Sequence, residues 1–197
     1  MQFVRAAARM SVVIAVAACA PLGAAADMQT IDRDRSTLTI DVDKGGIFSA
    51  LADRHVIRAP IAAGLVTLEG TLGAELTVNA AELAAVDLAL SAAKRAEVTA
   101  RMLGPEVLDA ARYPEIRFSS TAIMPEGADR WRLTGMLLLH GVSRAVAGTV
   151  SLQDAHYRGQ LSLKQSAFGI RPISIAGGTV KVKDDVRVTF DIVVSNR

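Results

Sequence analysis

Histidines are the residues of this chain that most readily bind metals or exchange protons near neutral pH. There are three, His55, His140 and His156, and the first two fall at the ends of predicted strands. If the fold brought His55 and His140 to one rim, they could form a metal site or a polar anchor for a ligand. We favour the other interpretation, in which each is hydrogen-bonded at its own strand end, because a metal site needs three or four ligands at a recognisable spacing.

Motifs for other chemistry are missing from the sequence. It has no Gly-x-Ser-x-Gly elbow, no His-x-x-x-His pair, no calcium loop and no phosphate-binding glycine loop. The adjacent carboxylates Asp184 and Asp185 point to opposite faces of a strand or lie in a turn, so they are not placed for paired acid–base work. We therefore expect a protein that is not an enzyme and that has no cofactor and no bound metal.

The N-terminus has the pattern of an export signal. Arg5 and Arg9 precede an apolar run at 10–18, and three small residues end at Ala26. This pattern predicts a signal peptide over 1–26 and a periplasmic location.

An alternative leader is also compatible with this sequence. The residues before Cys19 resemble a lipobox, which would make 1–18 a lipoprotein leader and Cys19 a lipid anchor. Cys19 is the single cysteine of the chain, so a mature protein without it forms no disulfide.

Residues 27–197 are long enough for one sizeable core and are predicted to form one domain. The leader contains two of the 22 Lys and Arg residues, so the remaining 20 balance the 20 Asp and Glu. A formally neutral domain does not favour a nucleic-acid partner, and a membrane partner is expected only through Cys19. The sequence leaves a homodimer open.

Alternation of apolar and polar residues is the main structural signal. It predicts strands around residues 37–42, 54–60, 64–69, 75–79, 116–119, 131–139, 146–153, 156–165 and 186–194. Turn residues at 125–129, 141–143, 154–155 and 176–178 separate them. Helices are predicted at 45–54 and 92–103, with a further turn of helix at 106–112.

These elements predict an all-β protein of about eight to ten mostly antiparallel strands with one or two short helices. Such a sheet must pack on a second sheet or close into a barrel. We favour the barrel, because sandwiches rarely place a helix as long as 92–103 in mid-chain.

In a barrel the apolar parity of each strand points inward, toward either a packed core or a ligand. The candidate lumen residues are Leu38, Ile40, Phe48, Leu76, Ile116, Phe118, Val150, Leu161, Val188 and Phe190. The polar rim candidates are His55 and His140. Only 4% of the residues are aromatic, which favours a lumen that is not plugged.

Two motifs in fixed order resemble those of the YceI family of bacterial envelope proteins. The first has Asp109, Tyr113-Pro114, Ile116, Phe118 and Ser120, and the second has Gly135, Leu137, Gly141-Val142 and Arg144. Segments at 35–38, 168–170 and 182–186 extend the resemblance over nearly all of 30–195. The insert at 45–55 departs from the family pattern and could narrow the mouth of the barrel.

The resemblance implies an antiparallel, roughly eight-stranded lipocalin-like barrel that binds a polyisoprenoid or similar long amphiphile. The family has no shared catalytic residues to carry over. Two alternatives remain open at this point: a structural or stress-response envelope module with a filled lumen, and a metal-binding protein that uses His55 and His140.

Overall fold

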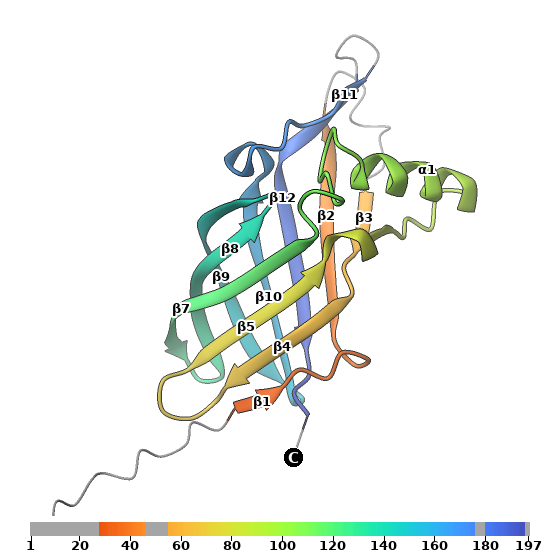
Figure 1. Cartoon of the computed structure of the whole chain (residues 1–197). Helices are drawn as coiled ribbons and strands as arrows, with labels where there is room; N and C mark the ends of the chain where they lie inside the picture. The colour runs from red at the N-terminus through yellow and green to blue at the C-terminus, as the bar shows by residue number, and fades with distance from the viewer. Residues whose placement is uncertain (1–27, 46–54, 176–179, 196–197) are drawn as a thin grey trace, which may run out of the picture.

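A single curled antiparallel sheet makes up most of the computed structural model, which describes residues 28–45, 55–175 and 180–195 (Figure 1). The predicted leader, Cys19 and Phe48 lie outside the described residues. The strands are β1 (Met28–Thr30), β2 (Thr37–Gly45), β3 (His55–Arg58), β4 (Ile61–Thr67), β5 (Gly73–Asn79), β6 (Ala84–Ala85), β7 (Glu115–Gly127), β8 (Arg130–Leu139), β9 (Val142–Gln153), β10 (His156–Lys164), β11 (Ser174–Ile175) and β12 (Val180–Ile192).

The sheet curls, and strands from near its two ends follow each other directly in the chain. Hydrogen-bonded neighbours follow the order β1-β4-β5-β7-β8-β9-β10-β12-β2-β3-β6. Strands β3 and β4, near opposite ends of this order, are separated only by Ala59 and Pro60, and the Ala59 N–H donates to the Leu38 carbonyl (2.9 Å). Proline at this bend removes a ladder donor where pairing passes from β2 to β5. The prediction of an all-β antiparallel fold with a helix is confirmed.

The predicted count of roughly eight strands is wrong, because the described residues form twelve. The additional strands include β1, β6 and β11, which have two or three residues each and give too short an alternation to be read from sequence.

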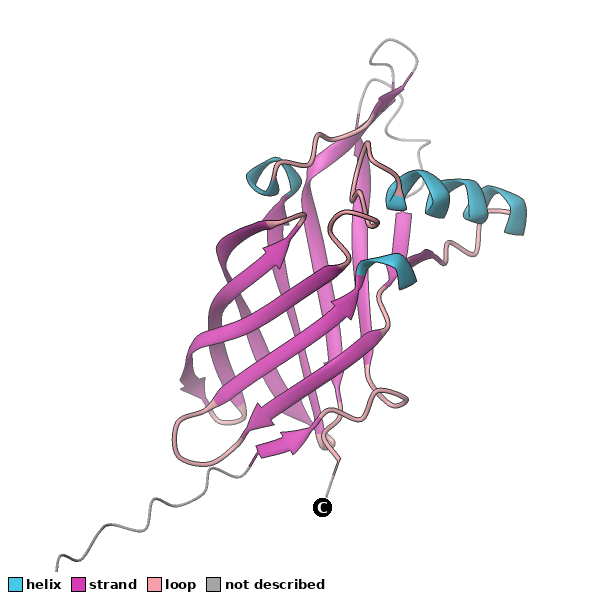
Figure 2. Ribbon diagram, in the orientation of Figure 1, coloured by secondary structure: helices cyan, strands magenta, loops and turns pink. Residues whose placement is uncertain are grey.

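Helix α1 (Ala92–Leu103) has the bounds that the sequence predicts. The Ser91 side chain caps its start by accepting from the Lys94 N–H, and Gly104 ends it. The further turn of helix predicted at 106–112 is not helical, since those residues form other turns, and the predicted helix at 45–54 lies outside the described residues except for Gly45, which ends β2. Short 3₁₀ helices, η2 (Ala80–Glu82) and η3 (Gln165–Phe168), are the other helical elements of the described residues (Figure 2).

The turn predicted at 125–129 is placed too early. Strand β7 continues through Pro125 to Gly127, and the turn comprises Ala128 and Asp129, whose φ of 53° is in the left-handed region. Pro125 is tolerated because β7 has register shifts on either side of it, where a ladder donor is not required.

Packing on the inner face of the sheet is densest toward the end where the helices lie. A cluster of buried residues there includes Val78, Leu83, Leu108 and Phe168, and Val98 and Met102 of α1 pack against it. None of the helices in the described part of the chain is long and apolar enough to span a lipid bilayer.

Candidate ligand-binding cavity

Inside the curled sheet lies a cavity of about 660 Å³. Apolar side chains from β2, β3, β4, β5, β7, β8, β9, β10 and β12 line it, and α1 borders one part. Its size is within the range of small-molecule sites in proteins, about 300–1,000 Å³. The inner face of the sheet is therefore only partly filled by its own side chains.

Nine of the ten predicted lumen residues line this cavity; the tenth, Phe48, lies outside the described residues. The nine are Leu38, Ile40, Leu76, Ile116, Phe118, Val150, Leu161, Val188 and Phe190. All nine are half-buried rather than fully buried, although they point away from the outer surface. Their remaining exposed area therefore faces the cavity, as it would in an unplugged lumen.

Strand register arranges these side chains in rows across the wall. Val188 of β12 pairs with Leu161 of β10 on one side and with Ile40 of β2 on the other, and Ile40 pairs in turn with Ile57 of β3. Because paired residues lie on the same face of a sheet, this row gives a continuous apolar strip across four strands.

Two glycines keep aromatic rings close to the wall. A Cβ at Gly159 would lie 2.4 Å from Cζ of Phe190, and one at Gly135 would lie 2.5 Å from Cζ of Phe118. Each ring therefore occupies the space in front of its glycine. A side chain at either glycine position would displace the neighbouring ring toward the middle of the cavity.

His55 is the predicted rim residue that borders the cavity. Its Nδ1 lies 2.8 Å from Oδ2 of Asp87, and the Val56 N–H donates to Oδ1 of the same carboxylate (2.6 Å). Since a carboxylate only accepts, Nδ1 of His55 is the donor in this pair. The His55 side chain is 17% exposed and that of Asp87 is 4% exposed.

Among the described residues, Asp87 is the charged residue that is buried. Hydrogen bonds hold the loop around it in place. The Val86 N–H donates to the Val56 carbonyl (2.8 Å), and Nη1 of Arg95 donates to the carbonyls of Asp87 (3.2 Å) and Leu90 (2.5 Å). A buried carboxylate with two donors on its oxygens is stable in this setting, whereas an unpaired one would be costly.

Charged residues of α1 border the cavity on the same side as His55. Nζ of Lys94 contacts Oε2 of Glu97 at 2.7 Å, and Nη2 of Arg101 contacts Oε2 of Glu106 at 3.1 Å. The i,i+4 spacing of Glu97 and Arg101 suggests a pair between them, but each has a different partner in the structure. Each of the two cations thus has an acidic partner.

The opposite end of the cavity is aromatic. His55 pairs with Val42, toward the C-terminal end of β2. At the other end of β2, Thr37 pairs with Asp191 of β12, and the next residue of β12, Ile192, pairs with Tyr157. Tyr157 and Trp131 both border the cavity, with ring centroids 6.4 Å apart. Burial raises the pKa of Tyr157 above its ordinary value, so its hydroxyl stays protonated.

His140 does not border the cavity, unlike His55. It occupies the turn between β8 and β9 with φ of 51°, followed by Gly141 with φ of 72°. Its ring lies 4.5 Å from the Tyr113 ring, and its Nδ1 is 3.2 Å from the Phe168 carbonyl, to which it donates. The polar edge of His140 therefore ties η3 to this turn rather than facing a ligand.

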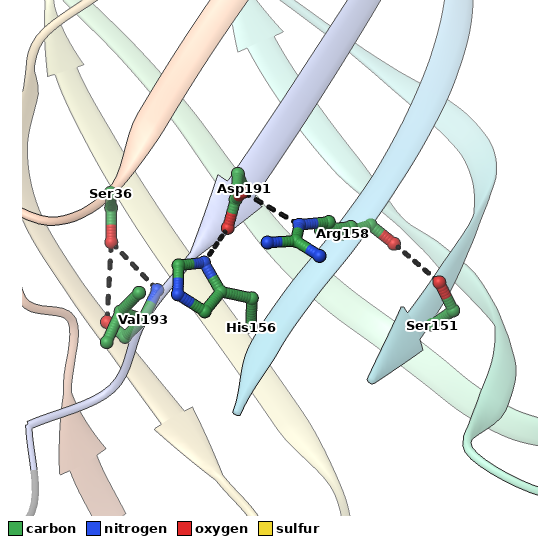
Figure 3. A network of polar contacts seen from close by, with 6 residues as sticks. All are labelled: Ser36, Ser151, His156, Arg158, Asp191 and Val193. Atoms are coloured by element: carbon green, nitrogen blue, oxygen red, sulfur yellow. Dashed lines mark hydrogen bonds and ion pairs between the residues drawn. The ribbon is translucent and has the colours of Figure 1, made fainter. Parts of the chain in front are cut away.

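The third histidine belongs to a polar network on the outer face of the sheet (Figure 3). Asp191 lies between His156, whose Nδ1 is 2.5 Å from Oδ1, and Arg158, whose Nε donates to Oδ2 at 2.9 Å. Burial acts to raise the pKa of Asp191, but hydrogen bonds from Arg158 and His156 outweigh it and leave this pKa below its ordinary value.

The metal hypothesis gains no support from this arrangement. His55 and His140 have different partners on different elements, and the described residues contain no group of three or more His, Cys, Asp or Glu side chains that could hold a metal ion. Sequence reasoning did not identify Asp87, since neither its neighbours nor its separation of 32 residues from His55 gives a recognisable signal.

Comparison with known proteins agrees with the geometry. The family of YceI-like domains matches residues 29–194. The crystal structure of Burkholderia cenocepacia BcnA superposes with a TM-score of 0.62, at 21% identity over 84% of this chain and 99% of that chain. A mutant Campylobacter jejuni YCEI protein gives 0.51, at 13% identity over 72% of this chain and 82% of that chain. No curated protein sequence matches this chain. Since the family match spans most of its length, the chain belongs to the YceI family.

Proposed function

We propose that this protein is a non-catalytic periplasmic carrier that holds a polyisoprenoid or another long amphiphilic lipid in the lumen of its curled sheet. The observation that carries the proposal is the cavity of about 660 Å³, whose apolar lining residues are only half-buried. An apolar ligand that covers this exposed area gains binding free energy, at roughly 0.8 kcal/mol per methylene buried.

An apolar chain needs no specific hydrogen bonds to bind in such a lumen. Shape and burial supply the driving force, and the polar head stays at an end where charged and polar side chains lie. Membership of the YceI family supports the same ligand class, because the fold is associated with polyisoprenoid binding. A stress-response module with a filled lumen is less compatible with the open cavity.

Export is part of the same proposal. A carrier for a water-insoluble chain is useful where two membranes are separated by an aqueous compartment, and the pattern at 1–26 is that of an export signal. Cell fractionation and N-terminal sequencing of the mature protein test it: a mature start at Asp27 supports ordinary secretion, and a lipidated start at Cys19 supports an anchored carrier.

Val188→Trp tests the open lumen directly. Val188 lies in the row between Leu161 and Ile40, so an indole there enters the cavity. We expect a melting temperature within a few degrees of that of the wild type but loss of binding of a fluorescent isoprenoid. In a packed core the same overfilling would cost about 1–3 kcal/mol.

Thr189→Trp is the matched control, because Thr189 is exposed on the outer face of the same strand. This variant is expected to bind the probe like the wild type. A large drop in melting temperature for Val188→Trp, together with no probe binding by the wild type, would mean that the lumen is a solid core and would remove the carrier proposal.

A further inference from the structure

The pair formed by His55 and Asp87 is an unusual feature of an otherwise apolar cavity. A buried carboxylate behind a cavity-lining imidazole costs desolvation energy, and the two donors on its oxygens only compensate for that cost. The wall would be simpler with an apolar residue at either position. The pair is therefore expected to have a role other than stabilising the sheet.

Asp87 determines which hydrogen-bonding group His55 offers. Because Nδ1 donates to Oδ2 of Asp87, the proton of the neutral ring is on Nδ1, and Nε2 keeps a free lone pair. No side chain of the described residues makes a hydrogen bond to Nε2. His55 borders the cavity, and Nε2 is the ring nitrogen that the bond to Asp87 leaves for a molecule inside it.

Charges near His55 indicate which head group fits. The cations that border the cavity on this side, Lys94 and Arg101, are already paired with Glu97 and Glu106. The Asp87 carboxylate adds a negative charge behind the imidazole. An anionic head group would meet no unpaired cation among these residues, whereas a hydroxyl group can donate to Nε2 without a change in charge.

We infer that His55, positioned by Asp87, binds the hydroxyl head group of a neutral isoprenoid alcohol or a comparable long-chain alcohol. This assignment rests on the proposed carrier function and specifies its ligand. The tail then extends from His55 toward Tyr157 and Trp131 at the opposite end of the cavity. Asp87 is a positioning residue, since it acts through His55 and does not border the cavity.

The test compares three ligands with the same tail: geranylgeraniol, its methyl ether and its monophosphate. Each competes with N-phenyl-1-naphthylamine, a fluorescent apolar probe, for the purified protein. The ether can only accept a hydrogen bond, so the wild type is expected to bind the alcohol about five- to tenfold more tightly, the range given by one net hydrogen bond. Equal binding of alcohol and ether, or tighter binding of the monophosphate than of the alcohol, would overturn the assignment.

Two variants locate the acceptor. His55→Asn keeps an N–H for Asp87 but removes Nε2, so the preference for the alcohol is expected to disappear while the ether binds as before. Tyr157→Phe removes the hydroxyl at the other end and is expected to leave the preference intact. The opposite pattern, with the preference lost only in Tyr157→Phe, would overturn the assignment to His55.

Asp87→Asn tests the positioning role. The Val56 N–H requires an acceptor, so the amide oxygen turns toward it and the amide NH₂ toward Nδ1 of His55. His55 must then carry its proton on Nε2, which donates equally well to the alcohol and to the ether. We expect the preference to fall to about onefold and the ¹⁵N spectrum of the His55 ring to show the other tautomer, and an unchanged preference would overturn the role of Asp87.

Failure of this assignment can be distinguished from failure of the carrier function. If alcohol and ether both displace the probe with equal affinity, the lumen binds lipids without a head-group site at His55. If neither ligand displaces the probe from wild type, and neither shifts its melting temperature, both the head-group assignment and the carrier function are overturned.

Discussion

Single residues of this protein show how hydrogen bonds compete with burial. At Asp191 on the outer face, burial disfavours the charged carboxylate, and two donors from the neighbouring strand more than offset it (Figure 3). Its folded-state pKa lies below the value expected of an unfolded chain. Its contribution to stability is therefore complete above about pH 4 and is lost as the pH falls through the folded-state pKa.

Asp191→Asn should lower the free energy of unfolding at pH 7 by about 1 kcal/mol, because His156 and Arg158 lose a charged partner. Urea unfolding at pH 7 and at pH 3 measures the change. The difference from wild type should be smaller at the lower pH, because the carboxylate of the unfolded chain is mostly protonated there and the stabilising contribution of Asp191 falls.

Asp43→Asn is the matched control for that experiment. Asp43 is half-exposed and lies 3.4 Å from Nζ of Lys183, so its loss should change stability little at either pH. If Asp191→Asn matched this control at pH 7, the network around Asp191 would have no net stabilising role.

At the scale of strands, glycine and aromatic residues on neighbouring strands act as pairs. Gly159 on β10 pairs with Phe190 on β12, and the ring occupies the space that a side chain at Gly159 would need. The wall is thus thin where the ring lies, and this leaves room for the cavity. The shape of the lumen depends on such pairs as much as on the size of the side chains that line it.

Gly159→Ala should destabilise the protein by about 1–3 kcal/mol, because the new Cβ would lie 2.4 Å from Cζ of Phe190 and 2.2 Å from the Thr149 carbonyl oxygen. Urea unfolding provides the measurement. Gly73→Ala is the control: its Cβ would be 3.5 Å or more from its neighbours, which is ordinary contact. Equal stability of the two variants would argue against a ring packed on Gly159.

Strand alternation is the part of the fold that sequence predicts well. The parity of Val186, Val188 and Phe190 alone indicates which face of β12 points inward, since a shift of one residue would turn all three outward. Sequence fails where tertiary contacts decide. The continuation of β7 through Pro125 is an example, because it depends on the register shifts with which β7 pairs with β8.

In the candidate site, too, local alternation was predictable from sequence and tertiary contacts were not. Lumen residues follow from local parity and could be named in advance. The partner of His55 could not, because Asp87 reaches it through a loop whose position depends on backbone bonds to Val56 and on Arg95. His140 resembled His55 in sequence, yet a turn with positive φ directs its Nδ1 to a backbone carbonyl instead.

On the scale of the whole molecule, the curled sheet encloses a cavity of about 660 Å³, and this volume limits how much apolar chain the lumen can take. Each carbon that enters the cavity gains up to about 0.8 kcal/mol, whereas a carbon beyond its end gains nothing. Affinity should therefore rise with chain length and then stop rising. The length at which it stops measures the usable lumen.

Isoprenols of two, three, four and eight isoprene units should bind the wild type with affinity that increases steeply and then reaches a plateau. Displacement of the fluorescent probe measures this series, and thermal melting provides a check, since ligand at 100 times its Kd adds about 2.7 kcal/mol of stability. Partial filling of the lumen by a larger side chain, as in Val188→Leu, should move the plateau to shorter chains. Affinity that keeps rising through eight units in both proteins would mean that the chain lies along an open surface, and the volume of the cavity would then not limit the ligand.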